Sequence, residues 1–269
     1  MLNLDKLKYF VVILTLFVGS VHAFGQRKGV NNLTFFDDRP LHFGFYLGLN
    51  TMDYRITNYN NVYDNPVFNN KPSEFKVNAD EYYGNKESFA AEVYTILPGF
   101  TVGGVVNYRL TRDFDLRFTP GMSLGSRSFK YFIELKKKLV DQSSGMDEKT
   151  YLTTPSAYVD LPIGIRYKGF RHYNTRPYVY LGAAYRQDLE NKRITESVVH
   201  LKKNGGYAEI GLGIDSYLEY FRFTAEFRFS YGLNSLIRHD SDSYKPIPYY
   251  GFIFKELNSN IFTLIFYFE

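Results

Sequence analysis

Residues 260–269 read N-I-F-T-L-I-F-Y-F-E, and two kinds of side chain alternate along them. Every second residue is large and apolar (Phe262, Leu264, Phe266 and Phe268), whereas the residues between them form a mixed set. Because side chains alternate between the two faces of a strand, this stretch predicts a β-strand with one apolar face. Such a strand would close a transmembrane β-barrel by pairing with the first strand, or would end a soluble β-sandwich. These residues alone favour neither fold.

The same alternation recurs upstream, and residues 221–232, F-R-F-T-A-E-F-R-F-S-Y-G, show it most clearly. Together with the closing stretch, it predicts eight strands, at 42–55, 99–110, 114–126, 155–168, 176–187, 205–218, 221–232 and 260–269. Between them, we expect a short helix at 87–94 and a charged hairpin loop over 127–153. If the sheet closes, residues 260–269 pair antiparallel with residues 42–55.

The connections between the predicted strands alternate in length. The second, fourth and sixth are about two to seven residues long, whereas the first, third, fifth and seventh run far longer, for example over 56–98 and 234–257. Outer-membrane barrels have short periplasmic turns and long extracellular loops, and a soluble sandwich has no reason to alternate in this way. The connections therefore favour an all-β, eight-stranded antiparallel transmembrane β-barrel.

The face opposite the bulky apolar residues combines glycine with charge. A soluble protein would send that charge to water, whereas a membrane barrel must enclose it in a narrow lumen. Buried charges are costly unless they are paired, and the predicted strands supply matching numbers of each sign. We therefore expect an interior ion-pair network made of Arg109, Asp115, Arg117, Asp160, Arg166, Arg186, Glu209, Asp215, Glu226 and Arg228.

Composition agrees with a membrane barrel. The chain has 25 Tyr and 25 Phe, and aromatic residues form girdles at both interfaces of outer-membrane barrels. The mean hydropathy of −0.29 is compatible with this class, because half of each strand faces a polar lumen. The formal net charge of +4 comes without a basic stripe, so we expect no nucleic-acid partner.

The first residues have the features of an export signal. Lys6 and Lys8 precede a short apolar run at 9–18, and Val21-His22-Ala23 offers small residues at the positions that a signal peptidase reads. We expect cleavage after Ala23, with an uncleaved membrane anchor as the alternative. The predicted organisation is a signal peptide (1–23), a periplasmic N-terminal arm (24–41) and an outer-membrane β-barrel domain (42–269). The chain has no Cys, which argues against lipid attachment and against disulfides.

Motifs for chemistry are nearly absent. The His residues lack metal-ligand spacing, and Gly211-Leu212-Gly213 reads as strand glycine rather than as a phosphate loop. The local cluster His239, Asp240, Ser241 and Asp242 is the best candidate for a lipid-modifying enzyme, but a solvated loop explains it better. The sequence therefore predicts no enzymatic activity, no metal and no cofactor.

Three segments are candidates for contacts with partners. Charge and aromatic residues mix at Phe35, Phe36, Asp37, Asp38 and Arg39, which suits docking to another protein, although a merely flexible arm is the alternative. Lys136-Lys137-Lys138 could contact lipopolysaccharide phosphates or could simply be solvated. Phe268-Glu269 is a candidate handle for the outer-membrane assembly machinery.

Several segments resemble the PorT (SprT) family. The resemblance lies in Asn32-Leu33 through Phe36-Asp37, Pro40, residues 42–45, 47–48 and 50–53, then in Leu97-Pro98-Gly99-Phe100, Arg109-Leu110, residues 116–121 and the tail 261–269. It spans essentially all of the chain that follows the predicted signal. PorT-type proteins are small outer-membrane barrels of Bacteroidota that are required for the type IX secretion system, which exports folded cargo proteins and, in some species, gliding adhesins. The family has no catalytic residues.

The resemblance and the charged lumen together indicate an accessory subunit. We expect a multi-pass outer-membrane protein, exported through the inner membrane, that supports type IX secretion through protein contacts and is not the pore. Its expected partners are other type IX components, outer-membrane lipid and lipopolysaccharide, and the assembly machinery. The alternative is a general small barrel that binds ligands or passes small solutes.

Overall fold

The computed structural model describes residues 31–59, 89–133, 149–189, 201–237 and 254–269. A short 3₁₀ helix, η1 (Phe36–Asp38), precedes a sheet of ten strands. The strands are β1 (Leu41–Asn58), β2 (Phe89–Ile96), β3 (Pro98–Arg109), β4 (Phe114–Phe118), β5 (Gly121–Ile133), β6 (Lys149–Lys168), β7 (Thr175–Asp188), β8 (Asn204–Tyr217), β9 (Arg222–Gly232) and β10 (Phe254–Phe268). No helix in these ranges is long and apolar enough to cross a bilayer.

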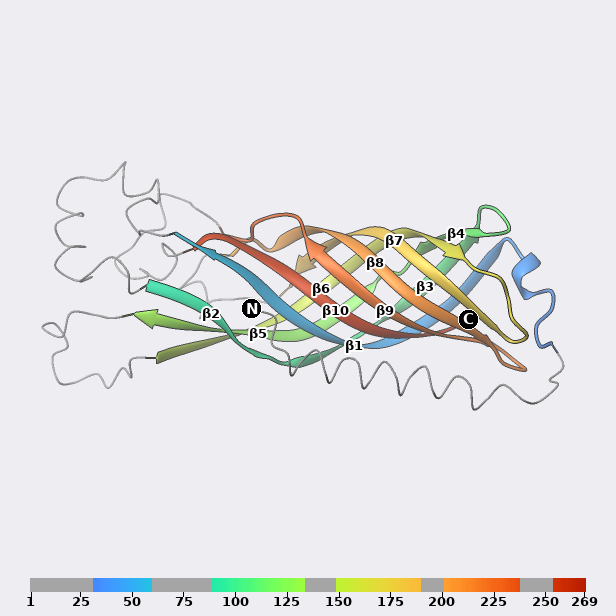
Figure 1. Cartoon of the computed structure of the whole chain (residues 1–269), viewed down its shortest axis with the longest axis horizontal. Helices are drawn as coiled ribbons and strands as arrows, with labels where there is room; N and C mark the ends of the chain where they lie inside the picture. The colour runs from blue at the N-terminus through green and yellow to red at the C-terminus, as the bar shows by residue number, and fades with distance from the viewer. Residues whose placement is uncertain (1–30, 60–88, 134–148, 190–200, 238–253) are drawn as a thin grey trace, which may run out of the picture.

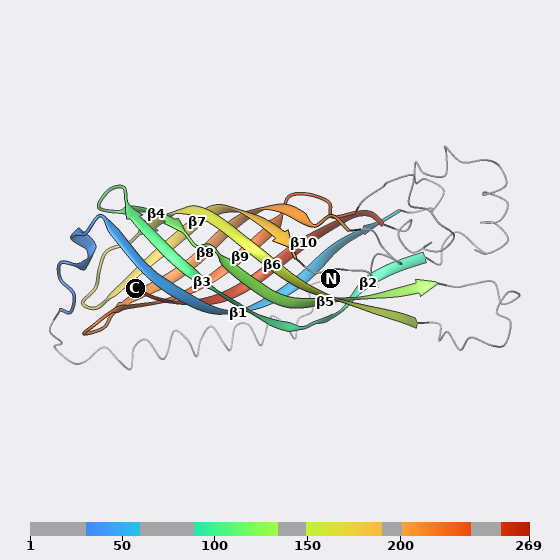
Figure 2. The same ribbon diagram turned by 180° about the vertical axis from the view of Figure 1, so that it is seen from behind.

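The antiparallel sheet closes on itself, because β1 pairs with β10 on one side and with β3 on the other. Only Leu97 separates β2 from β3, and only Thr119 and Pro120 separate β4 from β5, so each pair forms one interrupted barrel strand. A proline lies at each interruption, and proline has no N–H to donate to a ladder. The fold is therefore the predicted eight-stranded barrel, with the strongly tilted strands visible in Figures 1 and 2.

The first and last strands form the seam of the barrel. Their register runs from Phe45 opposite Phe268 to Asp53 opposite Asn260, and the ladder then continues as far as Asn58 opposite Phe254. The predicted pairing of residues 42–55 with residues 260–269 is thus confirmed. Phe45 and Phe268 stack on the outer face with ring centroids 5.0 Å apart. Closure removes both sheet edges, which a bilayer would otherwise leave without hydrogen-bond partners.

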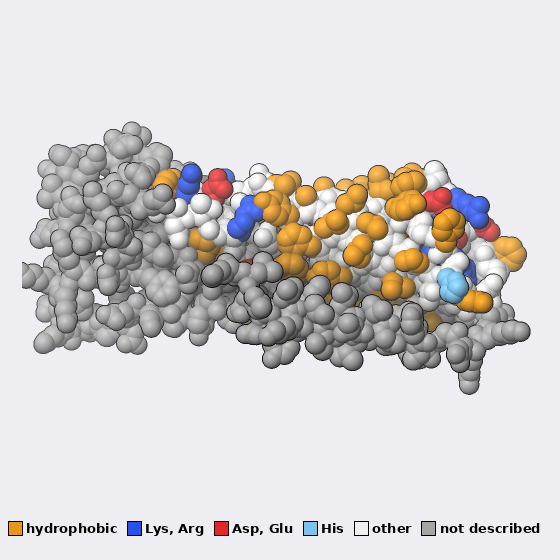
Figure 3. Space-filling view, in the orientation of Figure 1, with side chains coloured by type: hydrophobic (Ala, Val, Ile, Leu, Met, Phe, Trp, Pro, Cys, Tyr) orange, Lys and Arg blue, Asp and Glu red, His pale blue; other side chains and the backbone are white. Residues whose placement is uncertain are grey.

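The two faces of the barrel differ as the alternation predicts. On β9 the inward residues Arg222, Thr224, Glu226, Arg228 and Ser230 are all buried. The outward positions of the strands carry large apolar side chains, and Figure 3 shows these spread along the barrel with charged groups near its ends. A soluble protein buries its apolar side chains, so this polar interior and apolar exterior fit a barrel that faces lipid.

One end of the barrel carries the short connections, over residues 110–113, 169–174 and 218–221. The other end carries connections over 59–88, 134–148, 189–203 and 233–253. The N-terminal arm lies at the short-turn end (Figure 1), where the Arg109 amide donates to the Pro40 carbonyl at 2.8 Å. The Asn32 amide also donates to the Asn174 side chain at 2.8 Å.

Three expectations about the connections are wrong. The segment predicted as a helix at 87–94 lies mostly in β2, which pairs with β5 from Phe89 opposite Ile133 to Ile96 opposite Arg127. The loop predicted over 127–153 is largely strand at both ends, since β5 runs to Ile133 and β6 begins at Lys149. In the same way, β10 begins at Phe254, inside the loop predicted over 234–257. A strand that extends beyond a bilayer needs no apolar outward face, so the alternation fades while the ladder continues.

Candidate functional site

The lumen contains a chain of buried ion pairs that crosses the barrel. Arg117 of β4 lies 3.0 Å from Glu226 of β9, and these two strands stand on opposite sides of the closed sheet. Glu226 also pairs with Arg228 at 2.6 Å, and Arg228 continues to Glu209 of β8 at 3.2 Å. All of these side chains are almost completely buried. The contacts therefore tie opposite walls together through the middle of the lumen.

Two further groups extend this network. Toward the long-loop end, Arg186 pairs with Glu209 at 2.7 Å and with Asp160 at 3.0 Å. Toward the short-turn end, Arg166 pairs with Asp215 at 2.6 Å and lies 3.8 Å from Asp115. Each carboxylate thus faces at least one cation, which offsets the desolvation that burial imposes on both.

Tyrosine rings fill the space that the ion pairs leave. The Arg117 guanidinium lies between the rings of Tyr178 and Tyr267, 5.4 Å and 4.2 Å from their centroids. The Arg228 guanidinium lies 4.0 Å from the centroid of Tyr180. Gly213 makes room for Tyr178, because a Cβ at that position would lie 2.3–2.5 Å from atoms of the ring and its hydroxyl. Side chains therefore occupy the lumen, as the small circumference of eight strands requires.

The structure brings nine of the ten predicted network residues into this lumen and places Arg109 elsewhere. Arg109 lies at the short-turn rim, where it donates to the Asp37 carbonyl at 2.8 Å and lies 3.5 Å from Asp38. The prediction for Arg109 is wrong because its guanidinium binds the N-terminal arm, while its buried ladder partner Asp115 pairs with Lys168 instead.

The predicted network left out several buried charged residues, among them Arg127, Lys168, Arg222 and Glu269. Lys168 pairs with Asp115 at 2.6 Å, and Arg222 pairs with Glu269. Arg127 was assigned to a loop, although it continues the inward register of Ser123 on β5. If the alternation of inward and outward residues is continued from Ser123 through the polar residues that follow, it places Arg127 on the inward face.

The N-terminal arm closes the short-turn end of the lumen. The Asp37 carboxylate accepts a hydrogen bond from the Tyr217 hydroxyl at 2.7 Å and pairs with Arg176 at 3.2 Å and Arg222 at 3.7 Å. The Phe36 ring stacks on His42 with a centroid distance of 4.2 Å, and the Arg222 guanidinium lies 4.7 Å from its centroid. Phe36 and Asp37 therefore act as a plug that continues the interior network.

This docking corrects the expectation that all five residues of 35–39 are contacts for partners. Phe36 and Asp37 face the barrel, whereas Phe35 is 78% exposed and Asp38 and Arg39 are also exposed. Only these last three remain candidates for external contacts. The lipid-facing set Phe262, Leu264, Phe266 and Phe268 lies on the outer side of β10.

Comparison with known proteins assigns this architecture to a family. A family model described as an outer membrane protein β-barrel domain matches residues 24–238. The chain belongs to this family. No curated protein matches it. Two solved structures are similar: OprG from Pseudomonas aeruginosa (12% identity, TM-score 0.36, 84% of this chain and 92% of that chain) and a Pseudomonas aeruginosa FadL homologue (12%, 0.23, 85% and 64%).

Membership of the outer-membrane β-barrel family indicates which end of the barrel faces the periplasm. In such barrels the short connections lie on the periplasmic side and the long connections on the extracellular side. The plug is therefore periplasmic. Outward aromatic residues mark this boundary, with Tyr108, Phe114, Tyr167 and Phe221 exposed near the short-turn ends of their strands. Tyr185 and Tyr231 are exposed toward the other end and mark the outer interface.

The plug of this outer-membrane barrel is predicted to depend on the charge of Asp37. Burial raises the pKa of Asp37, but the Tyr217 hydroxyl and the charges of Arg222, Lys168 and Arg176 outweigh burial and hold the pKa below its ordinary value. A depressed pKa means that the stabilisation is present above the unfolded pKa and is lost as the pH falls through the folded one. The plug should therefore weaken below about pH 4.

Asp37→Asn tests the plug by amide hydrogen exchange. The Phe36 and Asp38 amides donate to Leu33 and Phe35 carbonyls within the arm. At neutral pH, exchange there should rise roughly tenfold, as expected from losing about 1.5 kcal/mol of charge-assisted hydrogen bonding. The ratio of variant to wild-type rates should begin to fall below about pH 4 and should approach one only below the lowered folded-state pKa of Asp37. Asp38→Asn, at a more exposed site, is the matched control. Equal rates in the two variants would show that Asp37 does not hold the arm.

Neither of the two His residues that the structure describes, His42 and His172, belongs to a group that could hold a metal ion. His42 packs on Phe36, and His172 lies in the turn after β6, where its ring meets Tyr173 edge-on. Within the described ranges, no group of three or more His, Cys, Asp or Glu could hold a metal ion. His239, Asp240, Ser241, Asp242 and Lys136-Lys137-Lys138 lie outside those ranges.

Proposed function

We propose that this outer-membrane β-barrel is an accessory component of the type IX protein secretion system and acts through protein contacts rather than as the pore. The filled lumen supports the second part of this proposal, that the protein is not the pore. Arg117, Glu226 and Arg228 join opposite walls, and Asp37 closes the periplasmic mouth. A folded cargo protein cannot pass between side chains that already touch. The resemblance of the arm, strand and tail segments to PorT-type proteins supports the choice of secretion system.

The periplasmic end offers a surface suited to such contacts. Phe35 of the arm, Phe170 of the β6–β7 turn and Tyr220 of the β8–β9 turn are 78%, 97% and 84% exposed. Arg171 ties two of these elements together, since its guanidinium donates to the Asn32 carbonyl. Exposed aromatic residues beside charge are typical of the anchors in protein interfaces. Periplasmic or outer-membrane subunits of the apparatus are the expected partners.

Deletion of the gene tests the role in secretion. Cargo proteins should accumulate inside the deletion strain, and a plasmid copy of the wild-type chain should restore their export. Complementation with Phe170→Ser and Tyr220→Ser together should restore membrane insertion but not secretion, because these turns lie outside the sheet. Normal cargo export in the deletion strain would overturn the proposal.

Planar bilayers separate the proposal from the alternative of a barrel for small solutes. The purified wild-type protein should give no unit conductance, because the ion pairs and tyrosines fill the lumen. An open-lumen outer-membrane porin is the positive control. Stable single-channel steps from the wild-type chain would favour solute passage instead.

A further inference from the structure

The periplasmic mouth of the barrel forms a socket that holds an aromatic ring followed by a carboxylate. The ring of Phe36 stacks on His42, meets Tyr217 edge-on with the centroids 6.3 Å apart, and contacts the Arg222 guanidinium. Barrel residues thus contact this ring from three directions. We use the name socket for His42, Arg176, Tyr217 and Arg222.

The socket holds the carboxylate of Asp37 with three groups. Its Oδ2 atom accepts hydrogen bonds from the Tyr217 hydroxyl at 2.7 Å and from Arg176 at 3.2 Å, and its Oδ1 atom lies 3.7 Å from Arg222. Tyr217 and Arg222 are 1% exposed and Arg176 is 7% exposed. Hydrogen bonds between charged groups are about twice as strong as those between neutral groups, so the socket distinguishes a carboxylate from an amide.

The two cations of the socket also have partners on the barrel itself. Arg222 donates to Glu269 at 2.9 Å and lies 3.9 Å from Asp215. Arg176 lies 3.6 Å from Asp113. Departure of the arm would therefore leave no buried cation without a countercharge, which is the usual cost of breaking a buried ion pair. The socket is thus a preformed site that does not need the arm to complete it.

The arm fills this site imperfectly. Leu33 has a φ angle of 49°, in the left-handed region that is unfavourable for residues other than glycine. The 3₁₀ helix η1 has no side-chain cap. The Oδ1 atom of Asp37 is buried without a hydrogen-bond partner in the described part of the chain. A segment that is not tied to β1 could place its carboxylate without these penalties.

We propose that the socket is a recognition site for a segment of a periplasmic partner protein in which an aromatic residue precedes an acidic one, and that the arm competes with this segment as an internal ligand. The arm itself shows the chemistry that the socket accepts. Contacts at Asn32 and Pro40 hold the arm on both sides of the plug, so the plug stays beside the socket and returns when the partner leaves. This inference rests on the proposed role in protein contacts, and not on the identity of the secretion system.

The arm of a second copy is not the occupant. Three residues separate Asp37 from Leu41, the first residue of β1, so the carboxylate lies within about 14 Å of the wall that carries it. Two sheets that pack face to face already lie about 10 Å apart. The arm of a neighbouring barrel would therefore end at the wall of this one, short of the mouth of the lumen.

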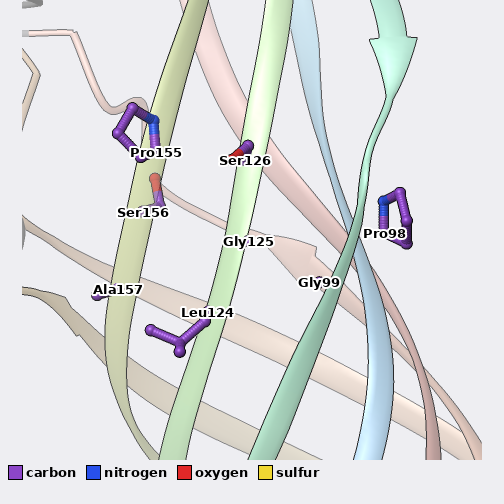
Figure 4. Close-up of a pocket in the computed structure, with 8 residues that line it drawn as sticks. All are labelled: Pro98, Gly99, Leu124, Gly125, Ser126, Pro155, Ser156 and Ala157. Atoms are coloured by element: carbon purple, nitrogen blue, oxygen red, sulfur yellow. The ribbon is translucent and has the colours of Figure 1, made fainter.

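The pocket on the barrel wall in Figure 4 has no comparable chemistry. It lies between β3, β5 and β6, and the residues that line it carry no charge and no aromatic ring. Recognition of an aromatic and acidic segment is therefore assigned to the periplasmic mouth.

Peptide binding tests the socket. The probe is a fluorescent peptide with the sequence of residues 31–41, and its anisotropy reports binding to the full-length barrel in detergent micelles. Phe36→Ser with Asp37→Asn removes the internal ligand, and Phe35→Ser with Asp38→Asn is the matched control, because it places the same changes on exposed neighbours. The peptide should bind the first variant roughly tenfold more tightly, since the arm of the control still competes for the socket.

Two further measurements locate the binding. A peptide with Asp37→Asn should bind the emptied socket roughly tenfold more weakly, because it lacks the charge-assisted bonds. A peptide with benzoylphenylalanine in place of Phe36 should cross-link to His42 or Tyr217. Equal affinities of the two variants, equal affinities of the two peptides, cross-links only to other residues, or no binding at all would each overturn the proposal. The assay uses purified components, so its failure is distinct from a failure of the secretion test.

Discussion

Replacing Glu226 by Gln is expected to lower the free energy of unfolding by about 3–5 kcal/mol, the usual cost of removing one partner from a buried ion pair. Glu226 is completely buried and pairs with Arg117 at 3.0 Å and with Arg228 at 2.6 Å. It also accepts a hydrogen bond from the Tyr178 hydroxyl. The amide keeps the shape of the side chain but leaves two buried guanidinium groups without their shared countercharge. Urea unfolding in lipid vesicles, followed by circular dichroism, measures the change.

Glu219→Gln provides the control for this experiment. Glu219 lies exposed in the turn between β8 and β9, so the same chemical change there should alter the unfolding free energy by less than about 0.5 kcal/mol. If the two variants unfold at the same urea concentration, the ion pairs across the lumen do not hold the barrel together.

Adding one methyl group inside the lumen should have the second-largest effect. Gly213→Ala places a Cβ at 2.3–2.5 Å from ring and hydroxyl atoms of Tyr178, so the ring must move. That ring lies 3.8 Å from the Arg166 guanidinium, and its hydroxyl bonds to Glu226. We expect a loss of about 1–3 kcal/mol from overpacking, measured in the same unfolding assay.

The outward glycine Gly104 is the matched control for Gly213. A Cβ at Gly104 would meet only the Gly44 carbonyl oxygen, at 3.9 Å, so Gly104→Ala should be neutral or stabilise by up to about 1 kcal/mol. Equal unfolding free energies for the two variants would mean that Tyr178 has room to move and that the lumen is not tightly filled.

The fold could be predicted because three features of the sequence indicate the same barrel: the alternation of apolar and polar side chains, the alternation of short and long connections, and the matching numbers of inward charges of each sign. Residues 221–232 give the same division of faces in the sequence and in the structure, with Arg222, Glu226 and Arg228 inside. The faces of the seam strands also follow from alternation, since a shift by one residue would turn Phe262 and Leu264 into the lumen. These features are local in sequence, so a single chain reveals them.

The missed features depend on contacts between distant residues. Nothing local indicates that Asp37 joins Tyr217 and Arg176, which lie far along the chain. The position of Arg127 was not predicted because a polar, charged sequence outside the bilayer has the same pattern in a loop as in a strand that continues beyond the membrane. The interruption between β2 and β3 could not be foreseen either, because it depends on how both strands pair with β5.

The seam between β1 and β10 also determines when the barrel can form. Phe45 and Phe268 are nearly the whole domain apart in sequence, yet they are ladder partners. Long-range pairings of this kind fold slowly, because the entropy of closing the loop is lost before the contacts form. Until β10 arrives, β1 and β9 each expose a free edge that could pair with another chain. Assembly therefore has a late, vulnerable step, and a factor that covers β1 while β10 is delivered would protect the molecule at that moment.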